Sequence, residues 1–329
     1  MSFVVNNGVF VMYKEKVGEK TFAVPDGVSK IGAEAFRSCG NLESITIPYG
    51  VTEIGERAFY YCTNLTSITL PASVEKMGTE AFCGCKKLKS IELSDYIDEI
   101  SDKAFYYCSD LTSVKIPKNA RNIGFEAFYY CTNLLSVTIS PNVLTIGSEA
   151  FYRCESLEEI IIPDSVIKIG DRAFYDCTNL KTVTMGENVK KIGSWVFYNC
   201  TNLETVIYRD IKLSWEKIKN LQVRDVMKMI DRLDFSSKIS PSLKYDIVRQ
   251  LFMKGGNRDR FNNYFKKNFI KIFRYAIDTK DVEFAEKVTD DTRFLTSKNI
   301  EGLISYAHEK RSFEISIILM DYKDSKLKF

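Results

Sequence analysis

The chain has 329 residues, of which 45% are hydrophobic and 27% charged, a composition that excludes disorder as its main state. Its net charge of +3 is too small to indicate a nucleic-acid partner by itself. Residues 1–210 carry 21 basic and 26 acidic side chains, whereas residues 211–329 carry 25 and 17. This asymmetry favours two domains with different surfaces.

The first predicted element is a β-hairpin. Residues 3–5 and 9–12 are apolar and flank Asn7-Gly8, and Asn-Gly is the sequence that tight hairpin turns favour. The open end of a stack of repeats must be covered to hide its core. We therefore assign residues 1–24 to an N-terminal hairpin that caps the repeats after it.

Three residue types then recur every 23 positions. The columns are Cys39, Cys62, Cys85, Cys108, Cys131, Cys154, Cys177 and Cys200; Phe36, Phe59, Phe82, Phe105, Phe128, Phe151, Phe174 and Phe197; and Leu42, Leu65, Leu88, Leu111, Leu134, Leu157, Leu180 and Leu203. A fixed period of this length is the signature of a solenoid. We predict that residues 25–208 form about eight stacked repeats with the phenylalanines as a buried spine.

The order of residues within a repeat predicts its local structure. Leu42-x-x-Ile45-x-Ile47 has the alternation of a strand, and Pro48 ends it because proline cannot donate to a ladder. The glycine after Ile54 suits a tight bend. The Ala-Phe pair is predicted to pack a helical turn or 3₁₀ segment back onto the strand. Each repeat should therefore add one strand to a parallel sheet.

Residues 21–208 resemble the BspA-type leucine-rich repeats. The markers are the 23-residue step, the recurring Ile-Gly-x-x-Ala-Phe of residues 54–59 and 169–174, and the Cys-Thr-Asn-Leu of residues 62–65, 131–134 and 177–180. The resemblance implies a curved solenoid with a parallel sheet and a protein-interaction or adhesion role, with no catalytic residues. It also implies a bacterial cell-surface or secreted location. The chain shows no leader or anchor pattern, which leaves a cytoplasmic location open.

The 23-residue phase fades after residue 208, and from Ser214 the pattern becomes helical. Phe261, Phe265 and Ile272 follow helical spacing, and Pro241 suits a helix start. A weaker 31-residue repetition resembles ankyrin-type helix pairs. We assign residues 209–329 to a helical C-terminal domain. The predicted fold class is an α/β leucine-rich-repeat solenoid followed by a small all-α domain.

The cysteine column has two interpretations. Neighbouring rungs are close enough for disulfides, but parallel side chains make the required twist awkward, so we predict reduced thiols buried in the core. Cys83 is out of phase and falls at an outward position, which predicts a reactive thiol. Cys83-x-Cys85 lacks the second ligand pair of a zinc site, so no metal is predicted.

Nothing in the sequence predicts catalysis. His308 is the only histidine, which removes paired-histidine metal sites and disfavours Ser-His or Cys-His catalysis. No glycine-rich phosphate loop is present, and no cofactor is expected. We therefore predict a protein that is not an enzyme.

Tyrosines are the main candidates for partner binding. They follow the buried phenylalanines at one position and partly at the next, between two inward residues, and should face outward as a strip. The two columns are Tyr60, Tyr106, Tyr129, Tyr152, Tyr175 and Tyr198, and Tyr61, Tyr107 and Tyr130. Exposed tyrosine is favoured at protein interfaces. The alternative is that each ring only lies over its neighbour and shields the stack.

The outward strand positions form a second candidate surface. This row includes Glu92, Lys115 and Ile161 among threonines, although threonine also simply suits strands. Leucine-rich repeats often bind on this sheet.

We expect a protein partner, no nucleic acid, no membrane insertion and a monomer. Residues 264–271 interleave basic and aromatic residues, but their aromatics fall on the buried helical stripe. The leading hypothesis is an interaction or adhesion module that uses a repeat surface. The alternative is a structural spacer whose C-terminal helical domain makes the contacts.

Overall fold

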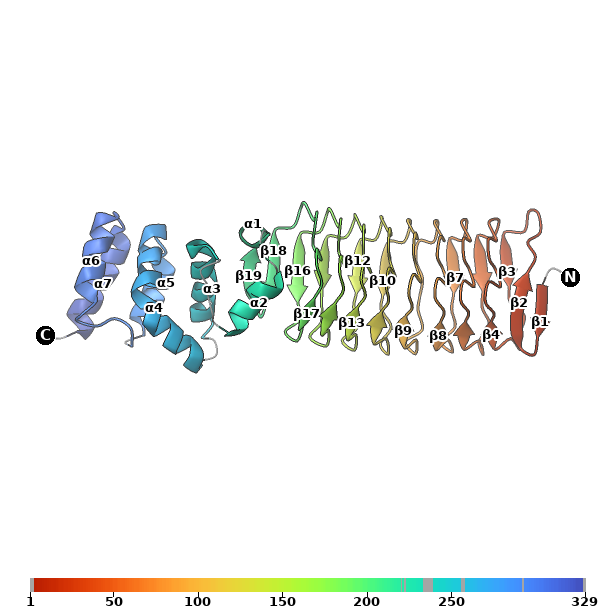
Figure 1. Cartoon of the computed structure of the whole chain (residues 1–329), viewed down its shortest axis with the longest axis horizontal. Coiled ribbons are helices and arrows are strands. Elements are labelled where there is room, and N and C mark those ends of the chain that lie inside the picture. The colour runs from red at the N-terminus through yellow and green to blue at the C-terminus, as the bar shows by residue number, and fades with distance from the viewer. Residues whose placement is uncertain are drawn as a thin grey trace. The chain divides into compact units, whose positions relative to one another are not determined.

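The computed structural model describes residues 3–219, 221, 223–232, 239–255, 258–291 and 293–327. It divides the chain into two compact units. Unit 1 contains Met1–Asp210 and Ser214–Glu216, and unit 2 contains Ile211–Leu213 and Lys217–Phe329. Figure 1 shows that unit 1 is built from strands and turns and unit 2 mainly from helices.

The predicted N-terminal hairpin is confirmed. Strands β1 (Phe3–Asn6) and β2 (Val9–Tyr13) pair antiparallel. The turn between them has φ values of 49° at Asn7 and 76° at Gly8, the left-handed values that Asn-Gly hairpin turns require. Strand β2 also pairs in parallel with β4 (Lys30–Ile31) of the first coil, so the hairpin continues the stack at its N-terminal end.

Each regular coil of unit 1 contains two short strands, not the single strand predicted. The long-strand side carries β3 (Thr21–Ala23), β5 (Ser44–Thr46), β7 (Ser67–Thr69), β10 (Ser113–Lys115), β12 (Ser136–Thr138), β14 (Glu159–Ile161), β16 (Thr182–Met185) and β18 (Thr205–Tyr208). The short-strand side carries β4, β6 (Glu53–Ile54), β8 (Lys76–Met77), β9 (Glu99–Ile100), β11 (Asn122–Ile123), β13 (Thr145–Ile146), β15 (Lys168–Ile169) and β17 (Lys191–Ile192). Paired strands are parallel and one coil apart, as in Ile45 with Ile68.

The third side of each coil, which we call the turn side, lies between the glycine and the cysteine of the repeat. The predicted helical turn is wrong here. Backbone amides donate to the next coil, as in Phe59 N to Ala81 O at 2.8 Å and Tyr61 N to Cys83 O at 2.7 Å. The φ angles of Arg57 and Tyr61 are 53° and 57°. These left-handed residues interrupt any helix and turn the amides along the solenoid axis.

The phenylalanine spine is confirmed. The rings from Phe36 to Phe197 stack with centroids 5.0–5.7 Å apart and planes within 16° of parallel. Because neighbouring rings cover one another and the spine rings are at most 3% exposed, the core is continuous through the repeats.

All nine cysteines are free and buried, which confirms the prediction of core thiols. The thiol of Cys62 donates to Phe36 O at 3.0 Å, and Cys131 repeats this contact with Phe105 O at 3.2 Å. The expectation that Cys83 is exposed and reactive is wrong. Its side chain is buried, and burial raises the pKa of the thiol to about 12, which disfavours the reactive thiolate.

One coil departs from the regular stack. Among residues 3–219, no strand pairing joins β8 to β9 on the short-strand side, although β9 pairs with β11. On the long-strand side the same coil keeps one bridge to the preceding coil, Thr69 with Glu92, whereas β10 pairs only with β12. On the long-strand side this coil is therefore bridged to the preceding coil, and on the short-strand side it is paired with the following coil. We call residues 89–101 the tilted coil. The long-strand ladder is also interrupted between β12 and β14.

The glycine column explains the tilt. A Cβ built on Gly78 would lie 2.4 Å from Glu56 N, and one built on Gly147 would lie 2.4 Å from Gly124 O. Neither glycine has a left-handed φ, so glycine is needed for close approach of the coils and not for the bend we predicted. Ser101 occupies this column and carries a Cβ. The tilted coil must therefore stand away from its predecessor at this corner.

Unit 2 contains β19 (Ile211–Ser214) in part and the helices α2 (Val223–Arg232), α3 (Pro241–Met253), α4 (Arg258–Thr279), α5 (Val282–Thr289), α6 (Ile300–Glu309) and α7 (Phe313–Lys326); α1 (Trp215–Ile218) spans the division between units. Helix α3 begins at Pro241 as predicted, with Ser240 as its N-cap. Helix α4 contacts α6, and α5 contacts α7. The ankyrin-type resemblance stays a prediction. No helix in the described residues is long and apolar enough to span a bilayer.

Candidate interaction surfaces

The turn side arranges tyrosines in a column. Successive rings of Tyr106, Tyr129, Tyr152, Tyr175 and Tyr198, which we call the tyrosine ladder, have centroids 4.6–5.0 Å apart and planes within 23° of parallel. Tyr107 and Tyr130 stack beside it at 4.7 Å. The ring spacing follows from the solenoid, because each coil contributes one ring to the ladder and neighbouring strands lie about 4.8 Å apart.

Tyr60 and Tyr61 form a separate pair. Their rings lie 4.7 Å apart, but Cys83 and Gly84 hold the equivalent positions in the next coil. A Cβ on Gly84 would lie 2.8 Å from Tyr61 Cδ2, so the Tyr61 ring occupies the space that glycine leaves. The predicted strip is therefore divided at this coil.

The ladder rings are half-buried because each covers the face of its neighbour. Of the nine tyrosines in the predicted strip, only Tyr198, at the end of the ladder, and Tyr61, outside the ladder, are clearly exposed, at 57% and 42%. Burial raises the pKa of Tyr106 to about 12 and that of Tyr129 further. The ladder thus presents ring edges and neutral hydroxyls, which can donate and accept hydrogen bonds.

Ion pairs border the ladder on both edges. Two positions before the phenylalanines, Arg172 Nη1 donates to Glu149 Oε1 at 3.1 Å and the guanidinium lies 5.0 Å from the centroid of Trp195. On the other edge, Arg153 Nε donates to Asp176 Oδ2 at 3.0 Å and its Nη1 to Tyr130 Oη at 2.6 Å. Both arginines are held between coils by these contacts.

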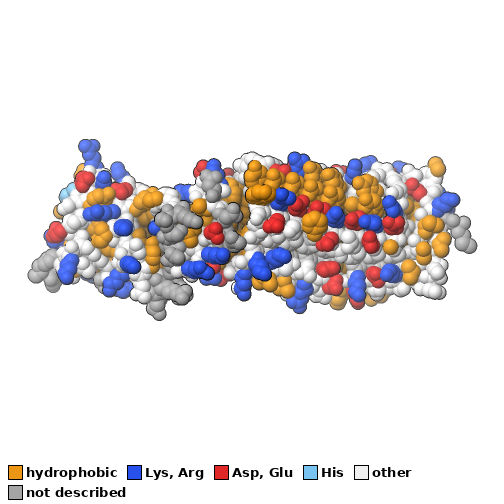
Figure 2. Space-filling view, in the orientation of Figure 1, with side chains coloured by type: hydrophobic (Ala, Val, Ile, Leu, Met, Phe, Trp, Pro, Cys, Tyr) orange, Lys and Arg blue, Asp and Glu red, His pale blue; other side chains and the backbone are white. Residues whose placement is uncertain are grey.

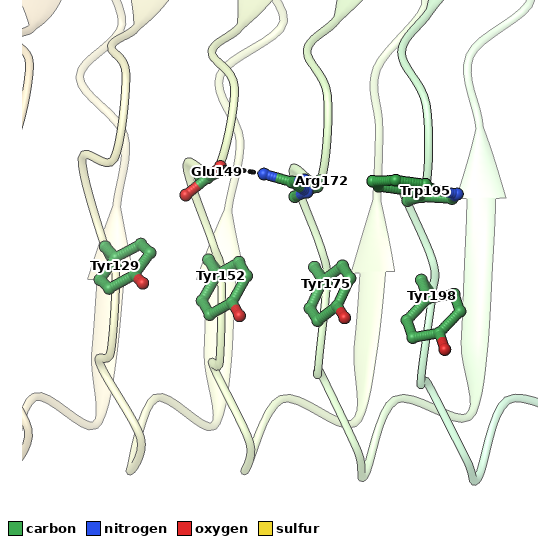
Figure 3. Close-up of a pocket in the computed structure, with 7 residues that line it drawn as sticks. All are labelled: Tyr129, Glu149, Tyr152, Arg172, Tyr175, Trp195 and Tyr198. Atoms are coloured by element: carbon green, nitrogen blue, oxygen red, sulfur yellow. Dashed lines mark hydrogen bonds and ion pairs between the residues drawn. The ribbon is translucent and has the colours of Figure 1, made fainter.

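A groove of about 460 Å³ runs between the ladder and one of these edges. Figure 3 shows its lining in two rows, with four tyrosines in one and Glu149, Arg172 and Trp195 in the other. In Figure 2 a band of hydrophobic side chains, a class that includes tyrosine, follows one edge of unit 1 and is bordered by acidic and basic side chains. Sequence reasoning missed Glu149, Arg172 and Trp195, although all three occupy one column of the repeat.

The second predicted surface is less uniform. Glu92, Lys115 and Ile161 are exposed on the long-strand side, Ile161 at 61%. Glu92 and Lys115 line a hollow of about 1000 Å³ between the tilted coil and its neighbours, whereas Ile161 lines neither this hollow nor the tyrosine groove. The row predicted from the sequence is therefore divided.

The other candidate groups give no site. In the described part of the chain, no cluster of three or more histidine, cysteine, aspartate or glutamate side chains could hold a metal ion. His308 is exposed near the end of α6. In the basic stretch of α4, Phe265 and Phe269 are buried and are not available for stacking on bases.

The similarity of this chain to known proteins covers its repeats. A model of the BspA type leucine rich repeat region matches residues 12–134 and 98–221, with six copies. No curated protein matches the chain.

Similar solved structures include a leucine rich cell surface protein from Faecalibacterium prausnitzii, with 27% identity over 62% of this chain and 73% of that chain and a TM-score of 0.46. A leucine-rich repeat protein from Bacteroides ovatus has 27% identity over 64% and 69%, with a TM-score of 0.42. A leucine-rich repeat protein from T. pallidum has 26% identity over 61% and 86%, with a TM-score of 0.44.

Proposed function

Because this chain belongs to the BspA-type leucine-rich repeat family, we propose that it is a non-catalytic protein-interaction or adhesion module that docks its partner along the tyrosine ladder. The family match supports a role in protein binding. The choice of face rests on the arrangement of the turn side.

The groove beside the ladder carries the proposal. Tyrosine combines a large apolar ring with a hydroxyl, and its rings here are already ordered by stacking on each other. Arg172 and Glu149 are likewise fixed by their ion pair. A partner therefore meets side chains that lose little further conformational entropy, which favours affinity. Trp195 is 56% exposed at the end of the groove, and tryptophan, like tyrosine and arginine, is enriched at interface hot spots.

A second function is favoured by a feature of unit 2. Phe313, Ile317 and Met320 are 60%, 57% and 43% exposed on α7 and are spaced to share one helix face. An exposed apolar stripe can also bind a protein. In this alternative the solenoid is a spacer and the helical unit makes the contact.

Three triple variants separate these functions. Two of them replace Tyr106, Tyr129 and Tyr152, one with phenylalanine and one with serine. The third replaces Phe313, Ile317 and Met320 with serine. The full chain is immobilised and exposed to extracts of the surface proteins of candidate partner cells. The retained protein is then purified, and its affinity for each variant is measured by titration. We expect the tyrosine-to-serine variant to weaken binding by roughly a hundredfold or more, because several interface side chains are lost together.

The tyrosine-to-phenylalanine variant keeps the stack and should lose only the part of the affinity that the hydroxyls supply. Thr46→Ala and Thr69→Ala on the long-strand side are the matched controls and should leave binding unchanged. Unaltered affinity in a folded tyrosine-to-serine variant would reject the ladder. Loss of binding in the α7 variant alone would favour the spacer.

A further inference from the structure

The hollow beside the tilted coil is a product of the tilt. The coil stays bridged to its predecessor at Thr69 and Glu92 but has no ladder pairing with β10. Backbone bonds close the two ends of this gap, from Thr112 N to Lys89 O at 3.0 Å and from Asn119 N to Asp95 O at 3.1 Å. An open space of about 1000 Å³ results, at the upper end of the range for small-molecule sites.

The lining combines apolar and polar side chains, and its charges are balanced. Glu92 and Asp95 contribute two carboxylates, and Lys115 and Lys118 two ammonium groups. Asp95 is bound to Lys118 at 3.0 Å, and this contact lowers the pKa of the carboxyl. Glu92 and Lys115 have no ion-pair partner within the described ranges, so both are available to a ligand. A site with no net charge favours a neutral, hydrogen-bonding ligand over an ionic one.

Tyr96 supplies an aromatic surface. Its side chain is 62% exposed and lines the hollow. Unlike the ladder tyrosines, it has no aromatic ring stacked on it among the described residues, and most of its side chain is open to solvent. Ser94, buried where neighbouring repeats carry proline, accepts a bond from Tyr96 N at 3.2 Å and donates to Ala72 O at 2.9 Å. The backbone that carries the ring is thereby anchored to the preceding coil.

We propose that this hollow binds a neutral oligosaccharide. The C–H face of a sugar ring packs against an aromatic ring such as that of Tyr96, while its hydroxyls bond to carboxylate, amide and hydroxyl groups such as those of Glu92, Asn119 and Ser113. The hollow is confined to three coils, a much smaller surface than stable protein interfaces need. Its lining shares no residue with the groove beside the tyrosine ladder, so it is a separate site.

Calorimetric titration of the full chain with cellohexaose, maltohexaose and chitohexaose tests the proposal. Sialyllactose and a heparin hexasaccharide serve as charged comparisons. We expect saturable binding of at least one neutral oligosaccharide, weakened roughly tenfold or more by Tyr96→Ala and by Glu92→Gln, because each removes one class of contact. Tyr49→Ala is the matched control, since this tyrosine is 83% exposed at the equivalent corner but outside the hollow.

Ser101→Gly provides a second, independent variant. It restores the glycine of the column without touching the lining, and should reduce binding by letting the tilted coil return to the regular stack. Circular dichroism confirms that each variant is folded. The proposal is overturned if no neutral oligosaccharide binds, if the charged ones bind more tightly, or if Tyr49→Ala weakens binding as much as Tyr96→Ala.

Discussion

Coils of residues 102–199 and the tilted coil of residues 89–101 are built from the same repeat, yet they stack differently. In the later coils the short-strand ladder continues from β9 to β17, and Gly124 N and Gly147 N each donate to the preceding coil at 2.8 Å. At Ser101 that backbone bond is replaced by one from the serine hydroxyl to Met77 O. A single Cβ in the glycine column therefore marks the position, within residues 3–219, where the short-strand ladder is broken.

The turn side behaves differently from the two strand sides. Phe82 N still donates to Ala104 O at 2.8 Å and Gly84 N to Tyr106 O at 2.7 Å. The spine is also unbroken, with 5.5 Å between the centroids of Phe82 and Phe105. The tilt thus opens the strand sides while the turn side holds the coils together. A repeat protein can in this way gain a local hollow without losing its core.

Alkaline pH should have the largest effect and should act on the whole stack, because the column of buried thiols continues on both sides of the tilted coil, at Cys85 and at Cys108. Burial raises the pKa of Cys200 to about 12, and that of Cys85 and Cys131 further. Their pKa in the unfolded chain is about 8.5. The stability from these neutral thiols is complete below that pH and is lost as pH rises toward the folded values.

Urea unfolding at pH 7.5 and pH 10, under reducing conditions, measures this loss. Each thiol changes the unfolding equilibrium constant by up to about tenfold per pH unit in that window. We expect a much lower midpoint at pH 10, and Cys131→Ala should reduce the dependence on pH. An equal midpoint at both pH values would contradict burial of the column.

Phe128→Ala should have the next largest effect. The ring is fully buried between Phe105 and Phe151, at 5.2 Å from each centroid. Truncation of a buried phenylalanine costs roughly 3–5 kcal/mol. Phe82→Ala, beside the tilted coil, tests whether the spine has the same strength there. A cost below about 1 kcal/mol at Phe128 would show that the stack does not depend on its spine.

Gly147→Ser should create a second irregular coil within the regular region. The added Cβ would meet Gly124 O, and such overpacking costs roughly 1–3 kcal/mol. Denaturation measures the cost, and exchange of the backbone amide of residue 147 in the variant shows whether its bond to Ile123 O is lost. The matched control is Gly302→Ser, because a Cβ there meets nothing within 4 Å. Equal stability of the Gly147→Ser variant and the unaltered chain would contradict the claim that this column needs glycine for the close approach of neighbouring coils.

Tyr129→Ser should have the smallest of these effects. The ring stacks at 4.8 Å on Tyr106 and at 4.6 Å on Tyr152, and each such pair contributes roughly 0.5–1.5 kcal/mol. We expect Tyr129→Phe to keep nearly all of this stability. If serine is tolerated as well as phenylalanine, the ladder adds nothing to the fold.

Much of unit 1 could be predicted from the sequence because its period is strict. The 23-residue columns identified the spine and buried thiols, and Asn7-Gly8 identified the hairpin. The second strand and the turn side were missed, since residues such as Arg57 and Tyr61 adopt left-handed φ values that no residue type there predicts. Ser101 is visible in the sequence as an exception, but its consequence follows only from how closely neighbouring coils approach.

The candidate sites were predicted in part. Tyrosine periodicity located the ladder but not the mutual covering of its rings, which depends on the distance between coils. Cys83 was misplaced because the alternation of inward and outward residues does not hold on the turn side. Glu92 and Lys115 were selected as outward residues, and Tyr96, which completes their hollow, was not.

The most direct test of this comparison is amide hydrogen exchange of the full chain, read at Ser101, Gly124 and Gly147 after correction for intrinsic rates. We predict that the Ser101 amide exchanges at least roughly tenfold faster than the two glycine amides, and that Ser101→Gly brings residue 101 to their level of protection. Equal protection at all three positions in the unaltered chain would contradict an open stack at the tilted coil.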